Sequence, residues 1–428
     1  MKHSLPRRLI AAAVGVVLAG LVAELGLRVA GWSQPQFYRP DAERGWGLAA
    51  GASGVYTAEG RGRVAINRFG FRGDEPRLAK PAGTLRVALL GDSQAEALQV
   101  DLADTFGEVL EERLAGCPSL PAGSRTVEVL NFGVSGYGTG QALLTLRHLA
   151  AAFEPDLVLL AVYTGNDVRN NLAELELDPL RPYFRLGWEG EPVLDDSFRD
   201  SSGFRRRTSW IGGAAYAVLD GVRLAQLAKA LWSALGERRA AAAAEARAEG
   251  GALAELGLDN AVYRPPGEAE DDPWRRAWEV TEALVLALDR EAAAVGAELA
   301  VATLSNGIQV HPDRATRRAF AARLGVADLT YPDRRLTGFA RQHGIPAIAL
   351  VFPLRRLAEE RGLYLHGFDA PADGATEAGG PDVERWNRGH WNRHGHRAAG
   401  TLLARWLCER SATGGGDRLA PGTGDPRQ

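Results

Sequence analysis

The sequence predicts an α/β protein built on a doubly wound parallel sheet of about five strands. Two observations lead to this fold class. Short runs that are apolar at almost every position end in turn residues, and strands this uniformly apolar are covered on both faces, as in parallel sheets. These runs alternate with segments whose apolar residues recur at helical spacing, which implies right-handed crossovers. With 428 residues and 46% hydrophobic content, the chain is long enough for a large core.

The first 31 residues are predicted to be a signal anchor that spans a membrane once. Lys2, Arg7 and Arg8 precede an apolar run from Leu9 to Ala23, which Glu24 interrupts before apolar residues resume. Counted through Glu24, the segment has about 19 residues, enough to cross a bilayer, and its basic flank favours a cytoplasmic N-terminus. A cleaved signal peptide is the alternative, although no convincing small-residue cleavage site follows the run. Both interpretations export the rest of the chain.

The elements of the α/β domain, expected over 84–410, follow in order. Residues 32–83 are rich in Gly, Pro and Arg and predict an irregular lead-in with a few short strands. The strands are expected within 84–93, 127–136, 155–167, 297–305 and 345–354, and the helices within 103–116, 139–153, 272–296, 332–344 and 395–408.

One insertion and one tail interrupt this regular pattern. The alternation stops after the third strand, and residues 172–270 are predicted to be an insertion. It contains a polar loop, an apolar helical stretch at 214–235 and an Ala/Arg/Glu-rich helix at 236–251 that is expected to be solvent-exposed or partly disordered. The polar, Gly-rich tail at 411–428 is expected to be disordered.

Bulk composition excludes one broad class of partner. The net charge of −3 and the pI near 6.3 give no basic excess for nucleic-acid binding. The glycine-rich GVSGYGTG segment lacks the Gly-Lys-Ser/Thr of a phosphate-binding loop and does not fit the dinucleotide pattern. Nothing in the sequence calls for a cofactor.

Conspicuous small and polar residues follow the ends of the first three strands. Ser93 ends a Gly-Asp-Ser sequence, Gly136 lies in NFGVSGYG, and Asn166 lies in Gly-Asn-Asp. Ligands of open α/β sheets bind at the carboxyl ends of the strands, so these segments are expected to meet in one crevice with His390, which precedes the last helix. Each segment alone is typical of a turn, but their order on successive strand ends favours a shared function.

This arrangement suits nucleophilic hydrolysis. Ser93 is the expected nucleophile and His390 the expected general base. A tetrahedral intermediate needs donors for its oxyanion, and the Ser93 N–H, the Gly136 N–H and the Asn166 side-chain amide are the candidates.

These four blocks resemble the SGNH, or GDSL, hydrolase superfamily, which is named for a Ser, a Gly, an Asn and a His. The matching residues stand in LLGDSQAEALQV, NFGVSGYG, YTGNDVRNN and GHWNRHGHRAAG, and the resemblance covers residues 85–171 and 296–410. It implies a flavodoxin-like fold and an acyl-Ser intermediate. The flanks resemble a bacterial branch with an N-terminal membrane segment, which places the domain on the periplasmic side of the inner membrane.

The resemblance also implies a range of substrates. The superfamily includes esterases, lipases, and enzymes that add or remove acyl groups on cell-wall and exported polysaccharides. An exported, membrane-anchored esterase or acyltransferase acting on acyl-ester or carbohydrate substrates is therefore expected. The acyl group, the choice between hydrolysis and transfer, and the oligomeric state stay open.

One part of the family pattern is missing. Many members carry Asp three residues before the catalytic His, where this chain has Asn387, followed by Arg388. Asp382 and Glu384 are candidates to replace it; the other options are a Ser–His dyad or a chain that is no longer catalytic. The last option gives the alternative function, a non-catalytic carbohydrate-binding or assembly protein on the same fold.

Two further possibilities concern metal binding and the cysteines. His390, His394 and His396 lie close enough in sequence to suggest a zinc site, but no Cys or carboxylate lies among them to complete one. Cys117 and Cys408 either remain free thiols or form a disulfide. In a flavodoxin-like order the first and last helices lie on the same face, and their ends could then be close enough to pair.

Overall fold

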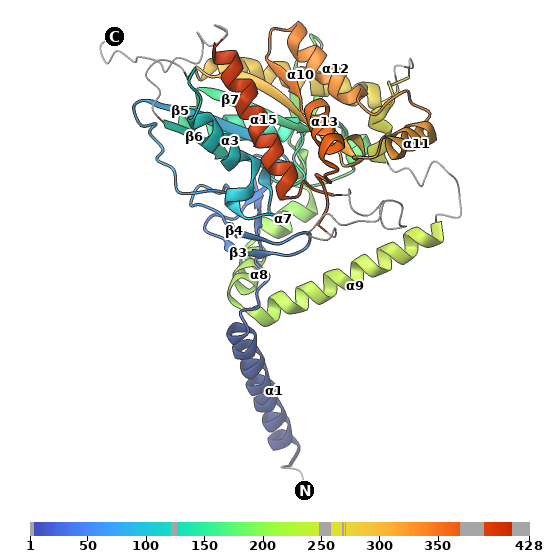
Figure 1. Cartoon of the computed structure of the whole chain (residues 1–428). Coiled ribbons are helices and arrows are strands. Elements are labelled where there is room, and N and C mark those ends of the chain that lie inside the picture. Colours follow the sequence, from blue (N-terminus) through green and yellow to red (C-terminus); the bar gives the residue numbers. More distant parts are fainter. Residues whose placement is uncertain are drawn as a thin grey trace.

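A computed structural model describes residues 4–120, 126–247, 258–267, 269, 271–368 and 389–412. Within these ranges a five-stranded sheet forms the centre of the molecule (Figure 1). All neighbouring strands are parallel, in the order β11-β10-β7-β5-β6. Counted along the chain, this is the 2-1-3-4-5 order of flavodoxin-like folds, as predicted. The strands are β5 (Thr84–Gly91), β6 (Thr126–Asn131), β7 (Leu157–Tyr163), β10 (Glu298–Leu304) and β11 (Ala347–Ala349).

Helices cover both faces of the sheet, so alternate residues of each strand enter two separate cores. Ala88 and Leu90 of β5 belong to one core, and Val87 and Leu89 to the other. This explains why the strands are apolar at most positions. The first core is covered by α4 (Thr139–His148), α10 (Pro273–Ala294) and α12 (Tyr331–Gln342), and the second by α3 (Phe106–Ala115), α13 (Val351–Arg361) and α15 (Arg393–Ala412).

The last strand is shorter than predicted. A strand was expected over 345–354, but β11 ends at Ala349 and α13 begins at Val351. Pro353 lies in the first turn of α13, where a missing N–H costs no intrahelical hydrogen bond, so the apolar VFPL segment begins a helix. Another helix, α11 (Arg314–Leu324), was not predicted. The last helix extends to Ala412, two residues into the expected tail, whose remaining residues lie outside the described part.

The irregular lead-in forms two small antiparallel hairpins near the carboxyl ends of the parallel strands. Tyr38 of the first hairpin donates from its hydroxyl to Oε2 of Glu96 (2.8 Å), one helical turn after Ser93. The buried guanidinium of Arg72 donates to the carbonyl of Val100 (2.7 Å). These bonds fix the lead-in to the segment that follows β5. The hairpins are β1 (Tyr38–Asp41) with β2 (Gly45–Leu48), and β3 (Ser53–Tyr56) with β4 (Gly62–Ala65).

The segment between β7 and α10 adds a hairpin and several helices. The stretch expected to be helical at 214–235 is divided at Val222, whose backbone is extended. The elements are α5 (Asp167–Asn170), α6 (Ala173–Glu176), β8 (Tyr183–Leu186), β9 (Pro192–Asp195), α7 (Ser202–Thr208), α8 (Trp210–Gly221) and α9 (Arg223–Arg247). Residues 248–251 of the predicted Ala/Arg/Glu helix lie outside the described part.

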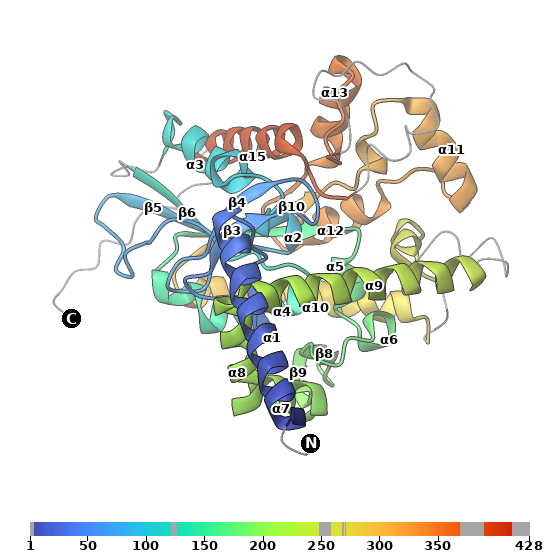
Figure 2. The ribbon, with the colours of Figure 1, turned by 90° about the horizontal axis from the view of Figure 1, so that it is seen from below.

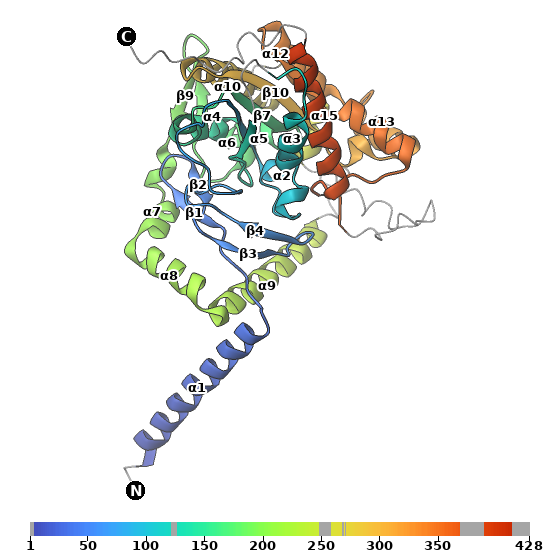
Figure 3. The same cartoon turned by 60° about the vertical axis from the view of Figure 1, so that its left-hand side comes forward.

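The N-terminal helix α1 (Ser4–Val29) projects away from the domain (Figures 1 and 3). Its segment Arg7–Val29 is long and apolar enough to cross a membrane, and none of its most apolar window is buried against the rest of the protein. Seen along α1 in Figure 2, α9 runs across the end of the domain from which α1 emerges.

Cys117 and Cys408 form a disulfide whose Cα atoms lie 5.7 Å apart. It joins the segment after α3 to the last helix, α15. These two helices pack side by side, and a Cβ on Gly400 would lie 2.7 Å from the Phe106 carbonyl oxygen. The first and last helices of the domain therefore share a face of the sheet, and the pairing considered from the sequence is confirmed.

Candidate active site

Ser93 stands at the point where β5 gives way to the short helix α2 (Ser93–Glu96). The Asp92 carboxylate caps this helix by accepting from the Gln94 N–H (2.9 Å). A Cβ on Gly91 would lie 2.9 Å from the Ala161 carbonyl oxygen, so glycine lets the chain turn tightly against β7. The Ser93 N–H is the first of the helix and has no intrahelical acceptor. The Ser93 side chain and its N–H thus both lie at the carboxyl end of β5.

His390 reaches Ser93 from the loop before α15. Its Nε2 atom lies 2.8 Å from the Ser93 Oγ, within hydrogen-bonding distance. Two bonds hold the loop: the Trp391 N–H donates to Gln94 Oε1 (3.0 Å), and the His390 carbonyl accepts from the Gly367 N–H (3.0 Å). The structure therefore brings together the two residues that the sequence singled out as nucleophile and base.

The acid beside His390 is Glu59, a residue that sequence reasoning missed. Its Oε2 bonds the His390 Nδ1, and its Oε1 accepts from the backbone N–H of His390 (2.8 Å). Glu59 belongs to the turn between β3 and β4, 331 positions before the histidine. The candidates considered from the sequence, Asp382 and Glu384, lie outside the described residues, as do Asn387 and Arg388.

Two glycines with positive φ make room for this contact. Gly389 has φ +81°, and a Cβ there would lie 2.1 Å from Glu59 Oε1. Gly60 has φ +63°, and a Cβ there would lie 2.6 Å from the Gln99 carbonyl oxygen. Both positions favour glycine for conformation as well as space. A glycine before the histidine and one after a lead-in glutamate were visible in the sequence, but nothing there linked them.

The electrostatics of the pair favour a charged carboxylate and a basic imidazole. Burial by itself lowers the pKa of His390. The hydrogen bond and negative charge of Glu59 oppose this effect, as do the charges of Asp92 and Glu96, and the net result is a raised pKa. Burial raises the pKa of Glu59, but its bonds and attraction to His390 leave it lowered. The carboxylate thus orients the ring and stabilises its protonated form.

The loops after β6 and β7 bring Gly136 and Asn166 to the same edge of the sheet. A Cβ on Gly133 would lie 2.6 Å from the Ala95 Cβ in α2, and one on Gly138 would lie 3.2 Å from the Asp167 carbonyl oxygen. Gly136 has φ +78°, which glycine adopts without strain. Within the described part of the chain, neither the Gly136 N–H nor the Asn166 side-chain amide donates a hydrogen bond. Both residues are only partly buried.

Two buried aspartates support this edge. Asp92 caps α2, and Asp167 Oδ2 accepts from the Tyr163 N–H (2.9 Å) at the end of β7. Burial raises the pKa of Asp92 to about 6. Burial, with the nearby Asp92 carboxylate, raises the pKa of Asp167 well above its usual value. Both side chains bond the backbone of the loops, so we assign them a bracing role.

The other histidines of the cluster do not join His390. His394 is exposed, whereas His396 is buried and stacks on Phe106 with ring centroids 6.0 Å apart. Burial lowers the pKa of His396 to about 3, so its ring is neutral. Among the described residues, no group of three His, Cys, Asp or Glu is arranged to hold a metal ion. The three histidines therefore have three separate environments.

Comparison with known proteins gives low similarities. No family model and no curated protein sequence matches this chain. Among solved structures, a catalytic mutant of an acetylxylan esterase from Geobacillus stearothermophilus has 12% identity and a TM-score of 0.33, covering 76% of this chain and 93% of that one. A GDSL-like lipase from Bacteroides thetaiotaomicron has 10% identity and a TM-score of 0.31, covering 76% and 89%. At these values, only the geometry of the site itself carries functional weight.

Proposed function

We propose that this chain is an exported, membrane-anchored serine esterase of the SGNH type that acts through an acyl-Ser intermediate. The observation that carries this proposal is the continuous contact from Ser93 to His390 to Glu59 at the carboxyl edge of a parallel sheet. Nucleophile, base and orienting acid in this order form the constellation that activates a serine hydroxyl.

In the proposed mechanism, Ser93 Oγ attacks the ester carbonyl while His390 Nε2 accepts the hydroxyl proton. The Ser93 and Gly136 N–H groups and the Asn166 amide donate to the oxyanion of the tetrahedral intermediate. His390 then returns the proton to the leaving alcohol, and Glu59 stabilises the imidazolium formed between the two transfers. An acceptor alcohol or water releases the acyl group by the reverse sequence.

We propose inner-membrane anchoring through α1, with the domain on the extracytoplasmic side. The basic residues before the span favour this orientation, and the disulfide is the kind of bond that persists in an oxidising compartment. The proposed substrates are acyl esters of cell-wall or exported polysaccharide. Hydrolysis and acyl transfer share every step up to the acyl-enzyme and differ only in the acceptor.

The decisive test is covalent labelling of the full-length protein in detergent with a fluorophosphonate probe. We expect labelling at Ser93, and we expect Ser93→Ala to lose both labelling and hydrolysis of p-nitrophenyl acetate, by at least about 10³-fold. Ser197→Ala, which changes an exposed serine far along the chain, is the matched control. Unchanged esterase activity in Ser93→Ala would overturn the assignment. An unlabelled parent would instead support the carbohydrate-binding alternative, which the missing Asp motivated.

A further inference from the structure

Helix α8 is apolar over almost its whole surface, yet none of its residues is buried. Trp210 is 82% exposed, Ile211 60% and Val218 51%. The first half of α9 continues this surface, with Trp232 76% exposed and Leu231 58%. A solvent-facing helix normally shows a polar face, and contiguous exposed apolar surface marks an interaction site.

Contacts with α1 fix the position of this surface relative to the proposed membrane. Glu24 in α1 accepts hydrogen bonds from the N–H groups of Arg223 (3.1 Å) and Leu224 (2.9 Å), at the start of α9. Arg28 donates to the carbonyl of Gly221 (2.5 Å), at the end of α8. The α8–α9 junction is therefore held against the last turns of α1, where a span meets the membrane surface (Figure 1). The charge that interrupts the apolar run of α1 has its partners here.

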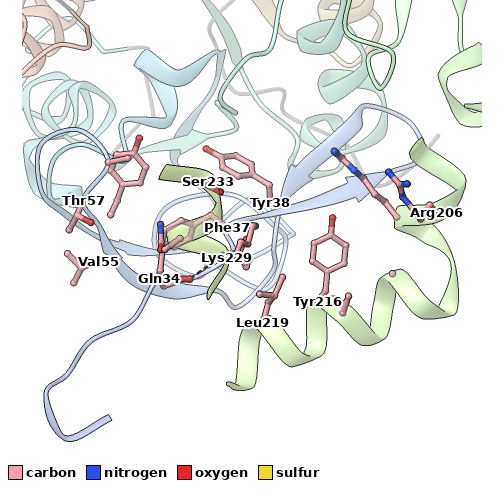
Figure 4. A pocket seen from close by; sticks show the side chains of 18 of the residues that line it. Gln34, Phe37, Tyr38, Val55, Thr57, Arg206, Tyr216, Leu219, Lys229 and Ser233 are labelled. Carbon is pink, nitrogen blue, oxygen red and sulfur yellow. Dashed lines mark hydrogen bonds between the residues drawn. The ribbon is translucent and has the colours of Figure 1, made fainter. Parts of the chain in front are cut away.

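Behind α8 lies a half-open cavity of about 800 Å³, lined by α7, α8, α9 and the lead-in hairpins. Figure 4 shows Phe37 and Val55 from the lead-in, and Tyr216 and Leu219 from α8, lining it. Its walls are thus mostly apolar, and its volume falls in the range of small-molecule sites. The cavity wall includes Thr57, two residues before Glu59, so the cavity borders the loop that carries the acid.

Cations collect at the same cavity without acidic partners. Arg206, Arg207 and Lys229 line it, and within the described residues none of the three forms an ion pair. By contrast, the neighbouring Arg39 is paired with Asp220 (2.5 Å). Burial, followed by repulsion from Arg39 and Arg207, lowers the pKa of Lys229. An apolar interior with uncompensated positive charge fits an anionic amphiphile.

We propose that this cavity binds an anionic lipid of the membrane leaflet on which α8 and the first half of α9 lie. Its hydrocarbon chain would lie against Phe37, Val55 and Leu219, and Arg206, Arg207 and Lys229 would pair with its phosphate. The inference rests on the proposed membrane anchor, because α1 sets the depth of the surface. It places a lipid beside the β3–β4 turn and so beside the candidate active site.

The test uses full-length Ser93→Ala protein in neutral dodecyl maltoside micelles, so that no probe is turned over. Binding of pyrene-labelled phosphatidylglycerol is followed by energy transfer from tryptophan. Unlabelled phosphatidylglycerol should compete at least tenfold better than phosphatidylcholine, and inorganic phosphate at the same concentration should not compete. Arg206→Gln/Arg207→Gln, which removes two of the three cations, and Ala215→Phe, which narrows the cavity without adding a tryptophan, should each weaken binding at least tenfold.

Arg205→Gln is the matched control, because Arg205 lies outside the cavity and pairs with Asp200 (2.6 Å). It should bind as the parent does. Fluorophosphonate labelling of each variant with Ser93 restored shows that the fold is intact. Parent-like lipid affinity in both cavity variants would overturn the proposal, and so would displacement by phosphate alone or equal competition by phosphatidylcholine. Failure of the esterase assignment would appear only in the labelling, and failure of the anchor only in membrane fractionation.

Discussion

Glu59 shows what a sequence can and cannot disclose about single residues. Ser93 and His390 were predictable because they belong to short blocks at strand ends, where an α/β fold places ligands. Glu59 was not, because it lies in an aperiodic lead-in and meets His390 only through the folded arrangement of the β3–β4 turn. The acids expected from the sequence lie within ten positions of the histidine, whereas Glu59 lies 331 positions before it.

Removing the charge of Glu59 should change both the rate and its pH dependence. The general base acts only as neutral imidazole, so activity rises with pH through the pKa of His390. Glu59 raises that pKa, and Glu59→Gln should therefore shift the rising limb of kcat/KM to lower pH. The rate itself should fall on the order of 10³-fold, because the imidazolium loses its counter-charge.

The measurement is a pH profile of kcat/KM for hydrolysis of p-nitrophenyl acetate. The control is Glu75→Gln, which changes an exposed glutamate of the lead-in. It should change neither kcat/KM nor the pH at which kcat/KM rises. If kcat/KM of Glu59→Gln rises at the same pH as that of the parent, a group other than Glu59 sets the pKa of His390.

Gly389 offers a second test at the residue scale. A Cβ at this position would meet the Glu59 carboxylate, so Gly389→Ala should displace the acid and lower kcat/KM much as Glu59→Gln does. Its matched control is Gly344→Ala, since Gly344 also has positive φ (+77°) but no atom within 4 Å of its Cβ position. Both should lose roughly 1–2 kcal/mol of stability from backbone strain. Equal activity in the two variants, measured by steady-state kinetics, would contradict the role of this contact.

At the scale of elements, apolar periodicity located the strands well and their ends less well. The four longer strands follow runs that are mostly apolar, because both faces of the sheet are covered. In the fifth, apolar residues continue past Ala349 into α13, and a short apolar run does not distinguish a buried strand from the buried face of a helix. The 214–235 stretch is divided at Val222, and Glu24 of α1 caps the start of α9 just after it, a contact that no local pattern contains.

The disulfide ties two elements on which the site depends. α15 follows the His390 loop directly, and Cys408 fixes that helix to the segment after α3. Cys117→Ser/Cys408→Ser should lower the free energy of unfolding by about 2–5 kcal/mol, since the cross-link closes a loop of 291 residues. Thermal unfolding of parent and variant gives the measurement, and the parent unfolded in reductant should match the variant. Identical melting temperatures would contradict a stabilising role.

At the scale of the whole molecule, the order of elements predicted the sheet but not what surrounds its edge. Right-handed crossovers and apolar strands leave few arrangements for the core. The lead-in hairpins and the helices between β7 and α10 carry no such constraint, so their meeting at the end of α1 could not be read from the sequence (Figure 3). The cavity and Glu59 both lie in these less regular parts.

Export and disulfide formation should depend on the same N-terminal segment. A chain lacking residues 1–31 should remain in the cytoplasm with Cys117 and Cys408 reduced, whereas the full chain should be oxidised and resist extraction from membranes at alkaline pH. Alkylation of thiols with a mass tag, before and after reduction, reports both states. Replacing residues 1–31 with a cleavable signal peptide should restore the disulfide in a soluble periplasmic protein. An oxidised pair in the cytoplasmic chain, or a full chain released without its first 31 residues, would overturn the uncleaved single-pass anchor.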